Sequence, residues 1–187
     1  MIPVPPLQNE DARFFEWVKN FYVTHKNLGV LYQERGQWEK SALSFENALR
    51  YTPSYFSSEY AATVKIKLGT VYDKMGYLEK ASQNLQEARL SASIPSRVDN
   101  LLGVISIKSG KKEQAEFYFK RAIQEDETYA PAHYNLGLLY LEINLPQKGI
   151  QELSKAARLS PHYNKILSSY DFSQNHTDSA TGEDKSP

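Results

Sequence analysis

Small and hydrophobic residues recur along this chain with the spacing of helical faces, and the same pattern returns several times. In its first copy, Leu28 and a following glycine begin the pattern, Gly36 interrupts it, and Phe45, Ala48 and Pro53 complete it. The glycine after the leucine recurs as Gly29, Gly69, Gly103 and Gly137, at intervals of 40, 34 and 34 residues. Each copy predicts a helix, a short turn and a second helix, and a period of this length predicts a stacked array of helix pairs.

The pattern also divides the chain into segments. We expect repeats over about 22–53, 62–95, 96–129 and 130–163, with a linker around 54–59 that carries Tyr55 and Phe56. Outside this array we expect an extended N-terminus at 1–8, an amphipathic helix at 9–21, a capping segment at 164–172 and a disordered tail at 173–187. A cap is expected because an array end exposes a face that another repeat would cover.

An aromatic stripe marks the predicted helix at 9–21. Phe14, Trp17, Val18 and Phe21 have the i, i+3, i+4, i+7 spacing of one helical face. We expect this face to cover the first repeat, and the alternative is a contact between two copies of the chain. The helix lacks the Lys/Arg-rich polar face of a helix that lies on a membrane.

Turn positions follow the same period. Gly36, Gly76 and Gly110 stand where the first helix of a pair ends, and Asn144 takes this place in the fourth repeat. Glycine, and next best asparagine, adopts the left-handed conformation that ends many helices. The third repeat departs from the pattern, because Ser106 replaces its tyrosine.

Over residues 22–163, these features closely resemble the tetratricopeptide repeat. The resemblance implies an all-α fold, a right-handed superhelical array of antiparallel helix pairs. It also implies that a protein or peptide partner binds along a concave groove lined by the first helix of each pair.

Groove positions can be assigned by their offset from the repeat glycine, and they include Thr63 on the second repeat. The candidate partner-binding residues are Lys26, Asn27, Val30, Ile66, Lys67, Thr70, Arg97, Asn100, Val104, Ile107, Tyr134, Asn135, Leu138 and Leu141. The first half of this groove is polar and mixed in charge. The second half is apolar, with Val104, Ile107, Tyr134, Leu138 and Leu141. We expect this half to receive an amphipathic helix or apolar segment of a partner. The alternative is coverage by residues 162–172 of the chain itself.

Two binding modes of the family can be compared with these positions. Members that grip a carboxylate terminus use basic residues and asparagines, and Lys26 and Arg97 match, whereas Val30, Lys67 and Leu101 do not. Members that hold a peptide backbone use a ladder of asparagines. Asn27 and Asn135 match that ladder, and Lys67 and Leu101 interrupt it.

Composition and the remaining motifs argue against catalysis. Lys+Arg and Asp+Glu both number 22, and this balance is not that of a general nucleic-acid binder. The chain has no cysteine, and its four histidines lack the spacing of metal ligands. The run Ser109-Gly110-Lys111-Lys112 lacks the other residues of a phosphate-binding loop. We therefore expect no enzyme activity, no cofactor and no metal.

We expect a non-catalytic adaptor or scaffold in the assembly of a protein complex. The alternatives are a co-chaperone or client-holding assembly factor, and the regulatory module of an enzyme. No stretch is apolar enough to span a membrane and no secretory signal is apparent, so the expected location is the cytoplasm. A homo-oligomer through the helix at 9–21 is a further possibility.

Overall fold

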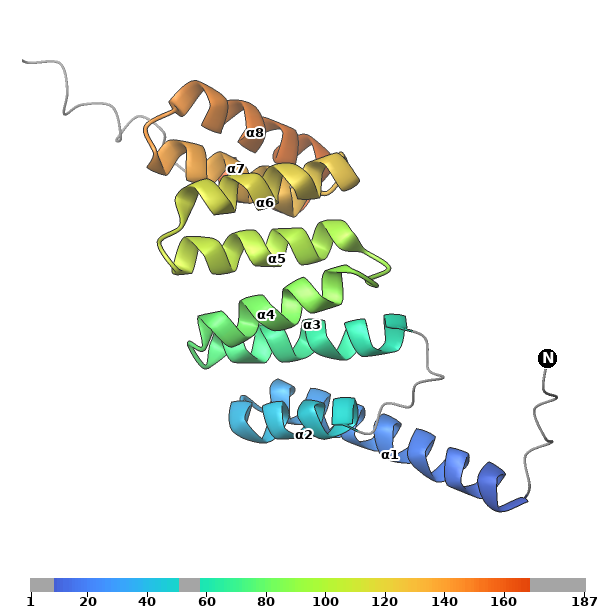
Figure 1. Cartoon of the computed structure of the whole chain (residues 1–187). Helices are drawn as coiled ribbons and strands as arrows, with labels where there is room; N and C mark the ends of the chain where they lie inside the picture. The colour runs from blue at the N-terminus through green and yellow to red at the C-terminus, as the bar shows by residue number, and fades with distance from the viewer. Residues whose placement is uncertain (1–8, 51–57, 169–187) are drawn as a thin grey trace, which may run out of the picture. The chain divides into compact units, whose positions relative to one another are not determined.

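The computed structural model describes residues 9–50 and 58–168, apart from the side chains of 9–12, 166 and 168. These residues form helices and turns, with no β-strand among them (Figure 1). The helices are α1 (Asn9–Glu34), α2 (Trp38–Arg50), α3 (Ser58–Lys74), α4 (Leu78–Arg89), α5 (Pro95–Lys108), α6 (Lys112–Glu125), α7 (Ala130–Glu142), α8 (Pro146–Leu159) and α9 (Pro161–Ser168). The all-α fold of antiparallel helix pairs is therefore confirmed. The predicted N-terminus at 1–8, the linker residues Tyr55 and Phe56, and the tail at 173–187 lie outside the described residues.

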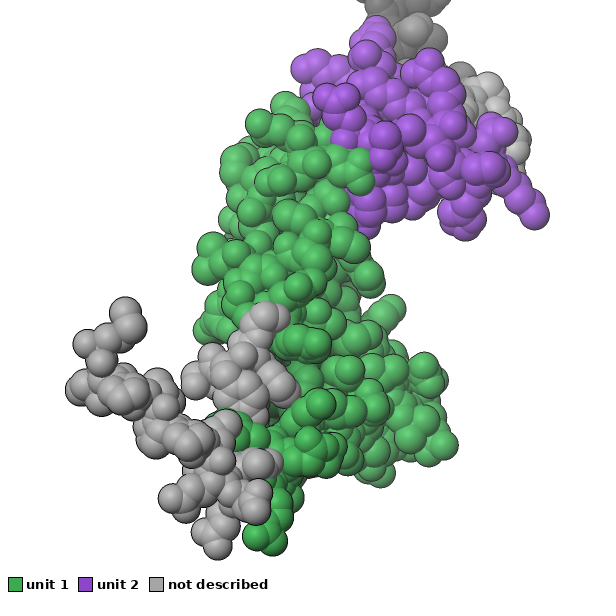
Figure 2. Space-filling model, turned by 90° about the vertical axis from the view of Figure 1, so that its right-hand side faces the viewer, with its two compact units in different colours: residues 1–126 green, residues 127–187 purple. Residues whose placement is uncertain are grey.

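The helices belong to two compact units, residues 1–126 and residues 127–187, which Figure 2 distinguishes by colour. In the first unit, α1 packs on α2, α3 on α4, and α5 on α6, and these pairs are joined by contacts of α2 with α3 and of α4 with α5. In the second unit, α7 packs on α8, and α8 also contacts α9.

The predicted N-terminal helix at 9–21 is not a separate element. It is continuous with the first helix of the first repeat, and the two together form α1. No glycine or proline lies between Asn9 and Leu28, so nothing in the sequence interrupts the helical hydrogen bonds there. The expectation that its aromatic face covers the repeat is wrong for two of its side chains. Phe14 is 62% exposed and Trp17 54% exposed, whereas Val18 is buried.

Close approach of the two helices in each pair depends on the repeat glycines. A Cβ atom at Gly29 would lie 2.6 Å from the Phe45 ring, and one at Gly69 would lie 2.8 Å from Leu85 Cγ. The same arrangement occurs between Gly103 and Phe119. A hydrogen atom at these positions therefore leaves the space that the facing side chain of the second helix fills.

The predicted turns are confirmed. Gly36, Gly76 and Gly110 have φ between 68° and 79°, and Asn144 has φ 59°. In each turn, the residue after the glycine or asparagine donates its backbone N–H to a carbonyl near the helix end, as Gln37 does to Tyr32 at 2.9 Å. These bonds satisfy carbonyl groups that the end of a helix would otherwise leave without a partner.

A tyrosine connects the first two helix pairs. The hydroxyl of Tyr72, on α3, donates a hydrogen bond to the carboxylate of Glu46, on α2. Burial and this bond raise the pKa of Tyr72 to about 12. The phenol therefore remains a neutral hydrogen-bond donor at physiological pH.

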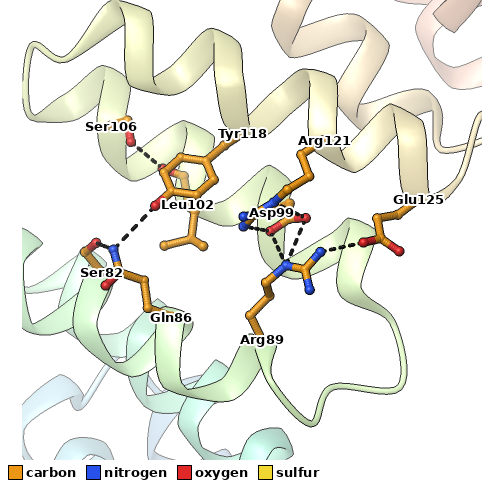
Figure 3. A network of polar contacts seen from close by, with 9 residues as sticks. All are labelled: Ser82, Gln86, Arg89, Asp99, Leu102, Ser106, Tyr118, Arg121 and Glu125. Carbon is orange, nitrogen blue, oxygen red and sulfur yellow. Dashed lines mark hydrogen bonds and ion pairs between the residues drawn. The ribbon is translucent and has the colours of Figure 1, made fainter.

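A charged cluster around Asp99 connects the second and third helix pairs (Figure 3). The carboxylate of Asp99, on α5, is fully buried and accepts hydrogen bonds from Arg89 Nε of α4 at 3.0 Å and from Arg121 Nε of α6 at 2.9 Å. Arg89 also donates to Glu125. The hydrogen bond to Asp99 raises the pKa of the Arg89 guanidinium above its ordinary value. Three helices therefore converge on one buried negative charge.

In the second unit, a histidine joins α7 to α8. His133 is buried, and its Nδ1 lies 2.6 Å from Glu152 Oε2. Its Nε2 lies 3.0 Å from the backbone carbonyl oxygen of Glu127. Lys155 donates to the other oxygen of Glu152 at 2.8 Å. Burial alone would raise the pKa of the Glu152 carboxyl, but the hydrogen bonds from Lys155 and His133 outweigh it and lower that pKa.

The lowered pKa of Glu152 predicts acid sensitivity of the α7–α8 pair. Its stabilising contribution is fully present above the ordinary carboxyl pKa of 4.5 and is lost as the pH falls through the lower folded-state value. Glu152→Gln should therefore cost about 1–3 kcal/mol at pH 7, and less as the pH falls below 4.5. Urea unfolding of the wild type and of Glu152→Gln at several pH values measures the difference in their free energies of unfolding. If that difference stays constant with pH, the Glu152 carboxylate does not stabilise the α7–α8 pair through its charge.

Candidate functional site

Six residues on the first-helix side of the 1–126 unit enclose a pocket of about 210 Å³. The lining residues are Thr63, Ile66 and Lys67 of α3, Ser93 and Ile94 of the α4–α5 connection, and Arg97 of α5. Three of the predicted partner-binding residues, Ile66, Lys67 and Arg97, therefore lie around one pocket.

The pocket combines positive charge with apolar surface. Among the described residues, neither Lys67 nor Arg97 has an ion-pair partner, in contrast to Lys108, which pairs with Asp73 at 2.6 Å. Ile94 is 53% exposed, and Ile66 packs its inner side against the hydrophobic core. Such a surface is suited to a carboxylate that lies next to an apolar side chain.

The repeat pattern identified Thr63 but missed Ser93 and Ile94. Both lie in the connection between helices, where the offset from the repeat glycine gives no position. A signal was nevertheless present, because Ile94 precedes Pro95, the first residue of α5. A residue before proline is held away from the helical conformation, and Ile94 has φ −129° and ψ 78°.

The other predicted groove residues of the 1–126 unit differ in accessibility. Asn27 is exposed, Lys26, Thr70, Val104 and Ile107 are half-buried, and Asn100 is buried. Val30 packs against the core, and the hydroxyl of Thr70 donates to the backbone carbonyl of Lys67 at 2.7 Å. Asn27 and Lys26 thus remain accessible to a partner, whereas Asn100 does not offer an exposed amide for a peptide ladder.

In the 127–187 unit, part of the predicted apolar surface is occupied by the chain itself. The ring of Tyr163, on α9, stacks on Tyr134 with centroids 4.7 Å apart. Leu141 packs against α8, since a Cβ atom at Gly149 would lie 2.7 Å from Leu141 Cδ2. Leu138 is 40% exposed, and Asn135 is half-buried. Of the predicted apolar side chains in this unit, Leu138 is the one most available to a partner.

Nothing in the described part of the chain points to metal or phosphate chemistry. No group of three or more potential metal-ligating His, Cys, Asp or Glu side chains occurs among the described residues. Gly110 has φ 73° in the turn between α5 and α6, so the Ser109–Lys112 run serves as a helix connection. Within the described residues, no helix has the length and apolar character that crossing a membrane requires.

Comparison with known sequences finds one family. A tetratricopeptide repeat family model matches residues 24–54, and a second model of the same description matches residues 100–129 and 130–176. No curated protein matches the sequence.

Solved structures with the same fold include the MamA protein, YrrB and BtubC from P. vanneervenii. MamA is 20% identical, with a TM-score of 0.65 over 79% of this chain and 77% of MamA. YrrB, described as a TPR protein with an unusual peptide-binding site, is 22% identical, with a TM-score of 0.64 over 79% of this chain and 73% of YrrB. BtubC is 20% identical, with a TM-score of 0.68 over 80% of this chain and 65% of BtubC. At these identities the likeness is one of fold.

Proposed function

Because the chain belongs to the tetratricopeptide repeat family, we propose that it is a non-catalytic adaptor that binds a segment of a partner protein on its first-helix surface. Repeats of this family are protein-interaction modules, and YrrB, which shares the fold, is described as having a peptide-binding site. The adaptor would act in the assembly of a protein complex. Its cytoplasmic location stays a prediction.

The observation that carries this proposal is the pocket between α3 and α5. Lys67 and Arg97 supply two positive charges without an ion-pair partner among the described residues, and Ile66 and Ile94 supply apolar surface beside them. The best-matched partner is an amphipathic segment that presents a carboxylate and an apolar side chain together. The carboxylate is an addition to the amphipathic or apolar partner segment predicted from the sequence.

Selection from a library of displayed peptides tests the proposal and does not require that the partner be identified first. We expect the selected peptides to be enriched in Asp or Glu next to a large apolar residue. The charge reversal Lys67→Glu/Arg97→Glu should weaken their binding at least about tenfold, since two attractive contacts become repulsive. Fluorescence anisotropy of labelled peptides measures the affinities.

The matched control is Arg35→Glu/Arg50→Glu, which makes the same change in net charge at two exposed positions outside the pocket. This control should retain binding. Peptides without acidic enrichment, or equal binding by both double variants, would overturn the assignment of the pocket. Loss of binding in Leu138→Glu alone would instead move the partner site to the 127–187 unit.

Two other functions are separated by the same experiment. A client-holding assembly factor would select apolar peptides with little preference for acidic residues, and would depend on exposed side chains such as Leu138. A regulatory module of an enzyme would bind a segment of that enzyme and alter its rate. Lys67 and Arg97 have no ion-pair partner in the part of the chain that the structure describes, and this favours the adaptor over the client holder.

A further inference from the structure

The third helix pair lacks a tyrosine–lysine contact that the other three helix pairs share. Three of the repeats place a tyrosine on the first helix and a lysine eight residues later, whose Nζ lies over the ring at 5.3–5.7 Å. These pairs are Tyr32 with Lys40, Tyr72 with Lys80, and Tyr140 with Lys148. In the third repeat, Ser106 and Gln114 stand at the two positions. The aromatic ring and its cation are therefore both missing.

Tyr72 shows what the ring does where it is present. It extends from α3 toward the preceding helix pair, where its hydroxyl donates to Glu46 of α2. One repeat later, Gln86 of α4 is the counterpart of Glu46, Ser106 of α5 that of Tyr72, and Gln114 of α6 that of Lys80. The serine is too short to extend across the same space.

That space is a pocket of about 210 Å³ between α4, α5 and α6, and all three counterparts line it. Its lining consists of three serines, three glutamines, the apolar side chains of Leu78 and Ile105, and the charged residues Glu79 and Lys111. None of its lining residues belongs to the α3–α5 pocket, so the two are separate sites in the 1–126 unit.

The amide of Gln86 is held in place beside this pocket. Its Nε2 donates to Ser82 Oγ at 3.3 Å and to the Tyr118 hydroxyl at 3.4 Å, as Figure 3 shows. Its carbonyl oxygen has no hydrogen-bond donor among the described residues. A hydroxyl that entered the pocket could therefore donate to Gln86 Oε1, as Tyr72 donates to Glu46.

We propose that this pocket binds a tyrosine side chain of a partner protein, which takes the place of the missing repeat tyrosine. The ring would contact Leu78 and Ile105, and its hydroxyl would donate to Gln86. The pocket carries the neutral amides Gln86 and Gln114 where the first two helix pairs have Glu46 and Lys80. The replacement of these two charged residues by amides suits an uncharged phenol from outside the chain, since a tyrosine hydroxyl is neutral and polar at physiological pH.

The probe for this site is p-cresol, the side chain of tyrosine without its backbone. Titration of the full chain, followed by NMR shifts of the glutamine side-chain amides, should show saturable binding with a dissociation constant on the order of millimolar. Toluene, which lacks the hydroxyl, should bind about fivefold more weakly. Ser106→Tyr/Gln114→Lys restores the pattern of the other repeats and should abolish the saturable shifts.

Two further variants serve as controls. The first is a size-matched change in this pocket, and the second changes the α3–α5 pocket alone. Gln86→Met, a substitution of similar size, should reduce p-cresol binding to the level of toluene. Lys67→Glu should leave it unchanged, so failure here and failure of the proposed adaptor function are distinguishable. The proposal is overturned if p-cresol gives no saturable shifts in the wild type, or if toluene binds with equal affinity. It is also overturned if folded Ser106→Tyr/Gln114→Lys binds p-cresol as the wild type does.

Discussion

Asp99→Asn is expected to lower the free energy of unfolding of the 1–126 unit by about 3–5 kcal/mol. The carboxylate is fully buried and accepts hydrogen bonds from both Arg89 and Arg121. An asparagine of the same size removes the counter-charge that the two guanidinium groups share, and it leaves Arg89 with Glu125 alone. Both arginine side chains are about a quarter exposed, so water compensates part of the loss and the lower end of the range is expected.

Urea unfolding followed by circular dichroism measures this loss. Asp73→Asn is the matched control, because it removes the same charge from an ion pair with Lys108, whose side chain is 45% exposed. That change should cost less than about 1 kcal/mol. Similar losses in the two variants would show that the buried cluster contributes no more than an accessible ion pair.

Gly103→Ala is expected to destabilise the 1–126 unit by about 1–3 kcal/mol. The added methyl group would overlap the ring of Phe119, which packs directly over the glycine. Alanine favours a helix over glycine by about 1 kcal/mol, so any net loss understates the steric conflict. Chemical denaturation of the purified variant gives the value.

A second substitution separates this conflict from other causes. Leucine faces the repeat glycine at Leu85 and Leu153, so Phe119→Leu gives the third pair a side chain that this fold already accommodates. In Gly103→Ala/Phe119→Leu, the loss should be smaller than the sum of the two single losses. Additive losses would mean that the alanine is harmful for a reason unrelated to Phe119.

Much of the fold could be predicted from local patterns. The turn residues Gly36 and Asn144 adopt positive φ because the chain must end a helix there, and this requirement depends on a few neighbouring residues. The close contact of Gly29 with Phe45 follows from one repeat of the pattern. Of the candidate site, the repeat offset predicted Ile66, Lys67 and Arg97, since each lies at a groove position on the first helix of its pair, α3 or α5.

Other features required side chains that are distant in the sequence. The exposure of Phe14 and Trp17 depends on what packs against α1, and their helical spacing alone is equally compatible with burial. Leu141 has the spacing of a groove residue, but its side chain packs against Gly149 of the next helix. Ile94 joins the α3–α5 pocket through a connection whose path the repeat does not define.

By itself, the sequence determined the helix pairs, their turns and the family, because these depend on spacing within about 34 residues. Only the tertiary structure decided how the pairs are joined. Asp99 and Arg121 lie one repeat after Lys65 and Glu87, which also form an ion pair. Arg89 joins Asp99 from the preceding helix pair, and this contact could not be predicted from the spacing within one repeat. The replacement at Ser106 was visible in the sequence, whereas the pocket it leaves depends on Gln86 and Gln114 of the two neighbouring helices.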